Sequence, residues 1–336
     1  MSAPKASRES ILVTGGAGYI GSHVVRHLGL AGERVVIVDN MSRGTRSNVT
    51  YGELVEGDIS DAATVSRVLA HHRVRTVMHF AAFTDVAESV TQPLRYYRNN
   101  VCATRTLLEC CSAAGVDEFI FSSSAAVYGN VPDGIADEQS PTSPINPYGA
   151  TKLAGEWMLR DISAACAMRY VTLRYFNVGG AEPTGRIGQS ARNATLLTKV
   201  AAEHVVGRRP YVSIYGTDYP TKDGTGVRDY VHVEDVSSAH VAALAYLRSG
   251  GCCTTLNVGY GRGASVREVL DLFQRETCRR LVVREEPRRL GDLPVLVARA
   301  DLIRTTLDWT PRNDNLGQLV ADSLRWERTL MTRATA

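Results

Sequence analysis

The chain has 336 residues, of which 44% are hydrophobic and 22% charged, and its formal net charge is +3 at pH 7. This mixture is typical of a soluble globular protein, and the scattered Lys and Arg residues argue against a nucleic-acid-binding or polybasic membrane-binding protein. No apolar run approaches the roughly 20 residues of a membrane span, and the stretch before residue 10 has no apolar segment of its own. The seven cysteines form no CxxC pair. We therefore expect reduced thiols, a cytoplasmic location and no metal site.

Strands and helices alternate in the first half of the chain. Short apolar stretches predict strands at 10–16, 34–40, 53–59, 75–82 and 118–124, and helical periodicity predicts helices at 19–33, 61–71 and 94–114. Such alternation requires crossover connections, which predicts a parallel sheet that is buried on both faces. Beyond residue 180 the rhythm is irregular. The predicted fold class is therefore α/β, a doubly wound parallel (Rossmann) sheet with a smaller C-terminal α/β domain.

The sequence GGAGYIG, residues 15–21, lies between the first predicted strand and the first predicted helix. Its glycines Gly15, Gly18 and Gly21 would let a pyrophosphate approach the backbone, where the helix N-terminus offers free N–H groups. Asp39 ends the second strand, where a carboxylate accepts hydrogen bonds from ribose hydroxyls and repels a 2′-phosphate. This pattern favours NAD over NADP as the cofactor. Asp58, which ends the third strand, could flank the adenine.

Tyr148 and Lys152 follow Pro147 and stand four residues apart, so they share one face of a predicted helix. A nearby ammonium group stabilises phenolate, and we expect it to lower the pKa of Tyr148 from its reference of about 10. Tyr148 would then be a general base. This spacing often occurs by chance, but Ser122 and Ser124 emerge at the carboxyl end of the fifth strand, where doubly wound sheets bind ligands. Together with the glycine motif, they favour the catalytic interpretation.

Six motifs in this order resemble those of the UDP-glucose 4-epimerases, members of the extended short-chain dehydrogenase/reductase family: GGAGYIG, FSSSAAVYG, YGATK, RYFNVGGAEPTG, YGTDYPTKDGTGVRDYVHVEDV and PRRLGDLP. The resemblance covers nearly the whole chain. It implies that Tyr148 removes the proton of the sugar 4-hydroxyl while NAD accepts the 4-hydride and later returns it to the other face of a 4-keto sugar. It further implies a second role for Lys152 at the nicotinamide ribose, and a homodimer formed by helices at 94–114 and 148–163.

The resemblance also implies the residues of both sites. Residues 1–180 would bind NAD and residues 181–336 the UDP-sugar, with a segment of about 228–260 packing back on the first domain. The implied catalytic residues are Tyr148, Lys152 and Ser124. The implied NAD contacts are Gly15, Gly18, Tyr19, Ile20, Gly21, Asp39, Asn40, Asp58, Ile59, Phe80, Ala81, Ala82, Asn99, Ser122, Tyr148, Lys152 and Tyr175. The implied substrate contacts are Ser124, Tyr148, Asn177, Leu197, Ser213, Tyr215, Arg228, Arg289, Asp292 and Leu296.

The chain departs from the family pattern at three positions. Thr84 stands where some members carry a lysine near the cofactor, and Leu196 stands where Asn or His is frequent near the diphosphate. Leu296 resembles the position that gates the sugar C2 substituent, and its size favours UDP-glucose and UDP-galactose over N-acetylated sugars.

Several alternative functions share the fold. A UDP-pentose (UDP-xylose/UDP-arabinose) or UDP-N-acetylglucosamine 4-epimerase remains open, since no residue clearly reads the sugar C6 group. A nucleotide-sugar 4,6-dehydratase is disfavoured, because Ala125 and Ala126 occupy the positions where those enzymes carry the acids needed for elimination of water. A non-catalytic NAD-binding protein is disfavoured because Tyr148 and Lys152 are both present.

Overall fold

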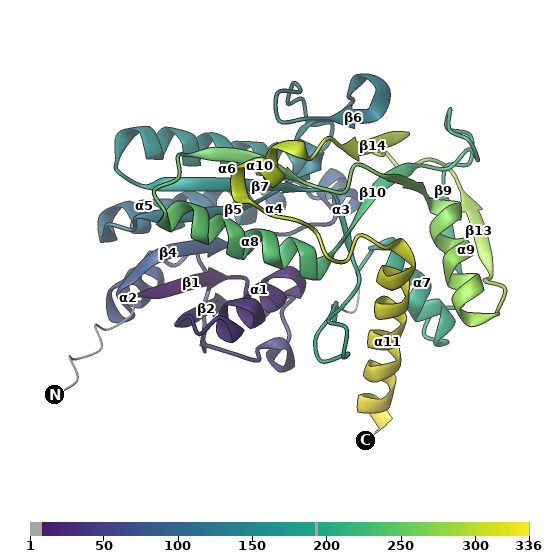
Figure 1. Cartoon of the computed structure of the whole chain (residues 1–336), viewed down its shortest axis with the longest axis horizontal. Helices are drawn as coiled ribbons and strands as arrows, with labels where there is room; N and C mark the ends of the chain where they lie inside the picture. Colours follow the sequence, from purple (N-terminus) through teal and green to yellow (C-terminus); the bar gives the residue numbers. More distant parts are fainter. Residues whose placement is uncertain (1–8, 192–193, 336) are drawn as a thin grey trace.

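A fully parallel sheet of seven strands forms the centre of the computed structural model, which describes residues 9–191 and 194–335. The strand order is β11-β7-β5-β4-β1-β2-β3 (Figure 1). The order reverses between β1 and β4, and doubly wound sheets bind ligands at the carboxyl ends beside this switch point. The predicted fold class is confirmed. The strands are β1 (Ser10–Thr14), β2 (Val35–Asp39), β3 (Glu53–Glu56), β4 (Val74–His79), β5 (Glu118–Ser124), β7 (Arg169–Tyr175) and β11 (Thr254–Val258).

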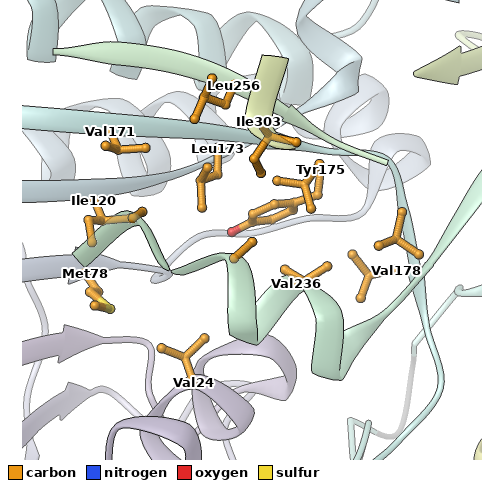
Figure 2. Packing of buried hydrophobic residues seen from close by; sticks show 14 of the residues in the cluster. Val24, Met78, Ile120, Val171, Leu173, Tyr175, Val178, Val236, Leu256 and Ile303 are labelled. Atoms are coloured by element: carbon orange, nitrogen blue, oxygen red, sulfur yellow. The ribbon is translucent and has the colours of Figure 1, made fainter. Parts of the chain in front are cut away.

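Helices cover both faces of this sheet because successive strand side chains point to opposite faces. Ile11 and Val13 of β1 pack with α1 (Tyr19–Leu30) and α8 (Val233–Arg248) on one face. Figure 2 shows this cluster, in which the Tyr175 ring lies among aliphatic side chains of the sheet, α1 and α8. Leu12, which lies between Ile11 and Val13 on β1, packs on the other face of the sheet. The helices of that face are α2 (Ala62–His71), α5 (Ala103–Ala114) and α6 (Pro147–Ala165).

The segment predicted as one helix at 94–114 has a more complex structure. It begins with α4 (Pro93–Tyr96), continues as a π-helical turn over Tyr97–Cys102 and ends as α5. Asn100 in the π turn is buried and donates to the Phe83 carbonyl at 2.9 Å and to Thr151 Oγ1 of α6 at 3.0 Å. The wider turn thus ties this helix to α6 and to the loop after β4. That loop leads into a short helix that the sequence did not predict, α3 (Val86–Thr91).

The C-terminal half builds a smaller region beside the sheet and also returns to it. Strand β11 pairs in parallel with β7, and α8 packs against α1 (Figure 1). In the described ranges, no helix combines the length and the apolar character needed to cross a bilayer. Helix α10 (Asp301–Leu307) also packs on α8 and β11. The smaller region takes β6 (Ile135–Ala136) from the first half of the chain and further contains β8 (Asn177–Gly179), β9 (Val212–Tyr215), β10 (Val227–His232), β12 (Gly263–Ser265), β13 (Val283–Glu286), β14 (Val295–Ala298), α7 (Leu197–Val205), α9 (Val266–Thr277) and α11 (Leu316–Thr335).

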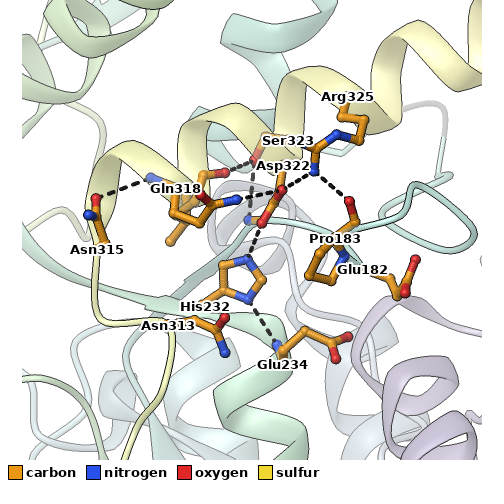
Figure 3. A network of polar contacts seen from close by, with 12 residues as sticks. Glu182, Pro183, His232, Glu234, Asn313, Asn315, Gln318, Asp322, Ser323 and Arg325 are labelled. Atoms are coloured by element: carbon orange, nitrogen blue, oxygen red, sulfur yellow. Dashed lines mark hydrogen bonds and ion pairs between the residues drawn. The ribbon is translucent and has the colours of Figure 1, made fainter.

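Helix α11 is fixed to the rest of the chain by buried polar contacts (Figure 3). The Asp322 carboxylate lies 3.2 Å from His232 Nε2 at the end of β10. Ser323 Oγ accepts a hydrogen bond from the Gly180 N–H at 3.2 Å, and the Gly180 carbonyl accepts one from the Tyr19 hydroxyl at 2.6 Å. These bonds connect α11, the segment after β8 and the first turn of α1. They therefore hold the two sides of the ligand crevice together.

Candidate active site

Two adjoining cavities lie at the carboxyl ends of the central strands, with volumes of about 1670 Å³ and 100 Å³. Both reach Gly15, Gly18, Phe80 and Ala82. Asn99, one of the implied NAD contacts, lines the smaller cavity and not the larger one. The smaller cavity also contains Asp39, Asn40, Asp58, Ile59 and Ala81. The larger one contains Tyr19, Ile20, Gly21, Ser122, Ser124, Tyr148, Lys152, Tyr175, Asn177, Leu197, Ser213, Tyr215, Arg228, Arg289, Asp292 and Leu296. The structure thus brings all predicted site residues together, while their individual ligand contacts stay predictions.

The glycine turn between β1 and α1 has no room for side chains. Gly15 has φ +70°, and a Cβ there would lie 2.6 Å from the Ala81 nitrogen. A Cβ on Gly21 would lie 2.3 Å from the Gly15 carbonyl oxygen. Gly18 is the N-cap of α1, so no side chain covers the first N–H groups of this helix. This bare turn at a helix N-terminus fits a pyrophosphate group.

Asp39 is held at the end of β2 before any ligand binds. Its carboxylate accepts hydrogen bonds from the Ala17 N–H at 3.0 Å and the Met41 N–H at 2.9 Å. Burial raises the pKa of this carboxyl above its usual value, and the two backbone bonds oppose that rise. Asn40 donates to Asp58 at 2.8 Å in the same cavity. The acid is therefore fixed where the sequence predicted a ribose contact.

Two arginines that pair with one glutamate form part of the cavity rim, and no sequence motif indicated this group. Glu88 of α3 pairs with Arg43 at 2.5 Å and with Arg95 at 2.6 Å. Both guanidinium groups lie over the Phe83 ring, at 5.0 and 4.6 Å from its centroid. Arg43 follows β2 and Glu88 follows β4, the two neighbours of β1 in the sheet, and both residues line the larger cavity together with the glycine turn. Beside Thr84, these arginines place positive charge at the rim where the family lysine is absent.

Tyr148 lies in the first turn of α6. The Asn146 side chain caps this helix by accepting the Gly149 N–H at 2.9 Å, and Pro147 fills its first position. Burial raises the pKa of the Tyr148 phenol, although a hydrogen bond with the Ser124 hydroxyl opposes the rise. The prediction that Lys152 lowers this pKa is therefore wrong for the protein by itself. The desolvation of the phenol outweighs the effect of the neighbouring groups.

Lys152 is buried and points its charge at the end of β5. Its Nζ donates to the Ser122 carbonyl at 2.7 Å and lies 5.3 Å from the Phe121 ring centroid. Burial lowers the pKa of Lys152 to about 8, and the charge of Glu156 one helical turn later opposes that shift. Ser122 therefore links this lysine to the strand whose last residue, Ser124, contacts Tyr148.

Tyr175 joins the same wall of the cavity from β7. Its hydroxyl is hydrogen-bonded to Ser122 Oγ and lies 3.5 Å from His240 Nε2. His240 contacts the Val236 carbonyl through Nδ1 at 2.8 Å, and burial lowers the pKa of this histidine to about 4. His240 is thus a neutral partner behind Tyr175. No sequence motif indicates this contact, because His240 lies on α8, 65 residues after Tyr175.

The predicted nucleotide contacts gather in the same larger cavity, on elements of the C-terminal half. The Arg289 guanidinium lies 4.5 Å from the Tyr215 ring centroid and donates to Asp292 at 2.9 Å. Arg228 of β10 is opposite Leu296 of β14 in the strand register. The wall therefore combines two guanidinium groups suited to a diphosphate with an aromatic ring suited to a base.

Within residues 9–191 and 194–335, neither metal binding nor the elimination of water has a matching set of side chains. Among the residues that the structure describes, no group of three His, Cys, Asp or Glu side chains could hold a metal ion. His23 and His27 stand one turn apart on α1, and both pair with the Glu234 carboxylate, at 3.8 and 2.8 Å. Ala125 and Ala126 follow Ser124 in a short 3₁₀ helix, so no acid occupies these positions. The larger cavity instead places the Tyr148 phenol and the bare glycine turn in one space.

Comparison with known proteins identifies the family. The family model described as NAD dependent epimerase/dehydratase matches residues 11–259. A UDP-glucose 4-epimerase of Azospirillum brasilense is 52% identical over 97% of this chain and 94% of its own length. The structure is similar to that of UDP-glucose 4-epimerase from Brucella ovis in complex with NAD (41% identity, TM-score 0.91, 94% of this chain and 97% of that one). It is also similar to that of UDP-glucose-4-epimerase from Stenotrophomonas maltophila with bound NAD and formylated UDP-arabinopyranose (40%, TM-score 0.92, 97% and 100%). The predicted resemblance is thereby confirmed, and the chain belongs to the NAD dependent epimerase/dehydratase family.

Proposed function

We propose that this protein is an NAD-dependent enzyme that epimerises the sugar C4 of UDP-glucose and UDP-galactose reversibly. The observation that carries the proposal is the larger cavity itself. It joins the glycine turn, the Tyr148–Ser124 contact and the arginines Arg228 and Arg289 in one continuous space. A dinucleotide, a reacting hydroxyl and a diphosphate could therefore meet there.

Tyr148 supplies the proton transfer in this mechanism. Its phenolate would take the proton from the sugar 4-hydroxyl and return it after the sugar turns over, while Ser124 holds the 4-oxygen. NAD, when bound, would accept the 4-hydride and give it back on the opposite face. Because burial raises the pKa of Tyr148, the ionised phenol needs positive charge close to it. Lys152 lies in the same cavity and is the cation of this chain placed to provide part of that charge.

The sugar must rotate between the two transfers without leaving the cavity. We therefore assign the grip to the nucleotide, through Arg228, Arg289 and Asp292, with the base beside Tyr215. The larger cavity also reaches Asn177, Leu197 and Ser213, which fits this assignment. None of these residues would touch the reacting ring, so their bonds can persist while the hexose turns.

An assay of the purified chain against four UDP-sugars, without added NAD, tests this function. Conversion of UDP-glucose to UDP-galactose supports it, and no conversion with or without NAD contradicts it. Leu296 is buried in the cavity wall, and its size predicts poor turnover of N-acetylated sugars. A kcat/KM for the N-acetylated UDP-sugars that is comparable to that for UDP-glucose and UDP-galactose would refute this preference. A UDP-pentose is the second candidate substrate, because a similar structure holds formylated UDP-arabinopyranose.

We further propose the domain roles that the sequence predicted, with residues 1–180 binding NAD and residues 181–336 binding the UDP-sugar. The return of α8 and β11 to the central sheet supports packing of about 228–260 on the first domain. A homodimer through the helices around 94–114 and 148–163 is supported by exposed apolar side chains there, Leu94 at 80% and Trp157 at 51%. Light scattering of the purified protein tests it. The seven free thiols support a cytoplasmic location.

A further inference from the structure

A buried ion pair lies directly behind the proposed catalytic residues. Arg174 of β7 donates to both carboxylate oxygens of Glu156 on α6, from Nε at 2.9 Å and from Nη2 at 2.5 Å. The two residues are 7% and 8% exposed. Desolvation offsets much of the attraction within a buried pair, so stability alone is a weak reason for placing two charges there. Its other contacts indicate a second role.

The Glu156 carboxylate also accepts a hydrogen bond from the Ser123 hydroxyl. Ser123 lies between Ser122 and Ser124 at the end of β5, where all three residues line the larger cavity. Those neighbours make the contacts described above: the Ser122 carbonyl accepts from Lys152, and the Ser124 hydroxyl bonds to Tyr148. One carboxylate therefore fixes the end of β5 at the residue between both catalytic contacts.

The partner of Glu156 is itself held in place from other elements. Arg174 Nη1 donates to the Tyr128 hydroxyl at 3.0 Å, and its guanidinium lies 4.9 Å from the Tyr128 ring centroid. The Tyr128 hydroxyl donates to Asn257 Oδ1 of β11 at 2.6 Å, and the Asn257 amide donates to the Ala136 carbonyl at 3.0 Å. The chain of bonds thus runs from β11 and β6 to the carboxylate, which leaves the ion pair little freedom.

Glu156 also follows Lys152 by one helical turn, and its charge favours the protonated lysine against burial. The other titratable groups around Lys152 are neutral or are the reacting phenol. His79 of β4 is buried with a pKa of about 3, lowered by burial and by Lys152. Burial raises the pKa of Tyr148 on α6 and of Tyr175 on β7.

We propose that Glu156 is a positioning residue for the epimerisation, acting through Ser123 and Lys152 without touching substrate or cofactor. The proposal rests on the proposed function, since it assumes that Lys152, Ser124 and Tyr148 form the reacting group. Removal of the Glu156 charge should therefore lower kcat and narrow the pH range in which the enzyme is active. The KM should change little, because the residues proposed to hold the nucleotide lie elsewhere.

The test uses the full-length variant Glu156→Gln, which keeps the size of the side chain and removes its charge. We expect kcat to fall about 10- to 100-fold, as for a small misplacement of reacting groups, with KM for UDP-glucose within about 2-fold of wild type. The decline of activity at high pH should begin at lower pH than in wild type, and Glu156→Asp should restore part of the rate.

Glu118→Gln is the matched control. Glu118 is buried at the opposite end of β5 and pairs with Arg169 of β7 at 3.3 Å, far along the strands from the crevice. We expect it to lower thermal stability and to leave the pH profile unchanged. An unchanged kcat and pH profile in Glu156→Gln, or an equal change in Glu118→Gln, would overturn the proposal.

Two further measurements keep the test decisive. If Glu156→Gln does not fold, Ser123→Ala removes the hydroxyl that the carboxylate holds, and wild-type kcat in that variant would overturn the proposal. Wild-type turnover of UDP-glucose tests the proposed function separately. NMR titration of Lys152 does not depend on turnover: it should lose its proton at lower pH in Glu156→Gln than in wild type, and an unchanged midpoint would contradict the coupling.

Discussion

Replacing Tyr148 by Phe removes one oxygen from the proposed site. The ring stays in the first turn of α6, whose Asn146 cap and Pro147 are untouched, and Ser124 keeps its bond with the Ala126 N–H at 3.2 Å. The lost group is the proposed general base, and such groups contribute about 10²- to 10⁴-fold to a rate. At 1.36 kcal/mol for each factor of ten, the activation free energy should rise by about 3–5 kcal/mol. The free energy of unfolding should change by only about 0.5–1.5 kcal/mol, the worth of one hydrogen bond.

Two measurements on the same preparation separate these effects. The conversion of UDP-glucose is followed by chromatography of the two epimers, and the affinity for UDP is measured by calorimetry. We expect the affinity for UDP to stay within about 3-fold of wild type, because the tyrosine hydroxyl contacts no predicted nucleotide residue. Tyr51→Phe, at a half-exposed tyrosine outside both cavities, controls for the loss of a phenol. A Tyr148→Phe enzyme with a tenth or more of the wild-type rate would remove the tyrosine from its role.

Three further predictions concern the cofactor and the fold. Asp39→Ala should raise the Kd for NAD about 10- to 100-fold and reduce the preference for NAD over NADP, as measured by binding titrations with both cofactors. Equal selectivity between NAD and NADP in wild type and variant would contradict the ribose contact. Arg43→Ala should speed the release of NAD about 2- to 10-fold, because it removes the Arg43–Glu88 ion pair from the cavity rim. Arg46→Ala on the same loop breaks the exposed pair with Glu56 and should leave the release rate unchanged. Equal release rates in the two variants would exclude the rim from cofactor retention. The buried histidines His23, His79 and His240 have lowered pKa values of about 3 to 4. Below pH 6.5 the unfolded chain therefore binds protons that the folded chain does not, and the free energy of unfolding should fall by up to about 1.4 kcal/mol per pH unit for each histidine. Urea titrations between pH 7.5 and 5.5 measure this fall, and a free energy of unfolding that does not change with pH would contradict the buried neutral state of the three histidines.

Local pattern was sufficient for five of the seven strands of the central sheet and for the glycine turn, whereas β7 and β11 were not predicted. Apolar runs bounded by turn residues predicted β1 to β5, and the spacing of Gly15, Gly18 and Gly21 beside Asp39 predicted where a dinucleotide binds. These features depend on residues close in the chain, and backbone geometry and burial leave few alternatives for them. The π turn at Tyr97–Cys102 was missed because a helical pattern does not distinguish a π turn from an α turn.

The sequence by itself determined the chemistry available, a phenol and a lysine on one helical face next to an NAD motif. The tertiary structure decided which side chains surround these two groups and in which direction the pKa of the phenol shifts. It brought Arg174 of β7 and His240 of α8 behind the site, where Arg174 pairs with Glu156 of α6, and it buried Tyr148 so that its pKa rises instead of falling. The physical reason is that desolvation and long-range hydrogen bonds depend on what surrounds a side chain in space, and spacing along the chain does not contain that information.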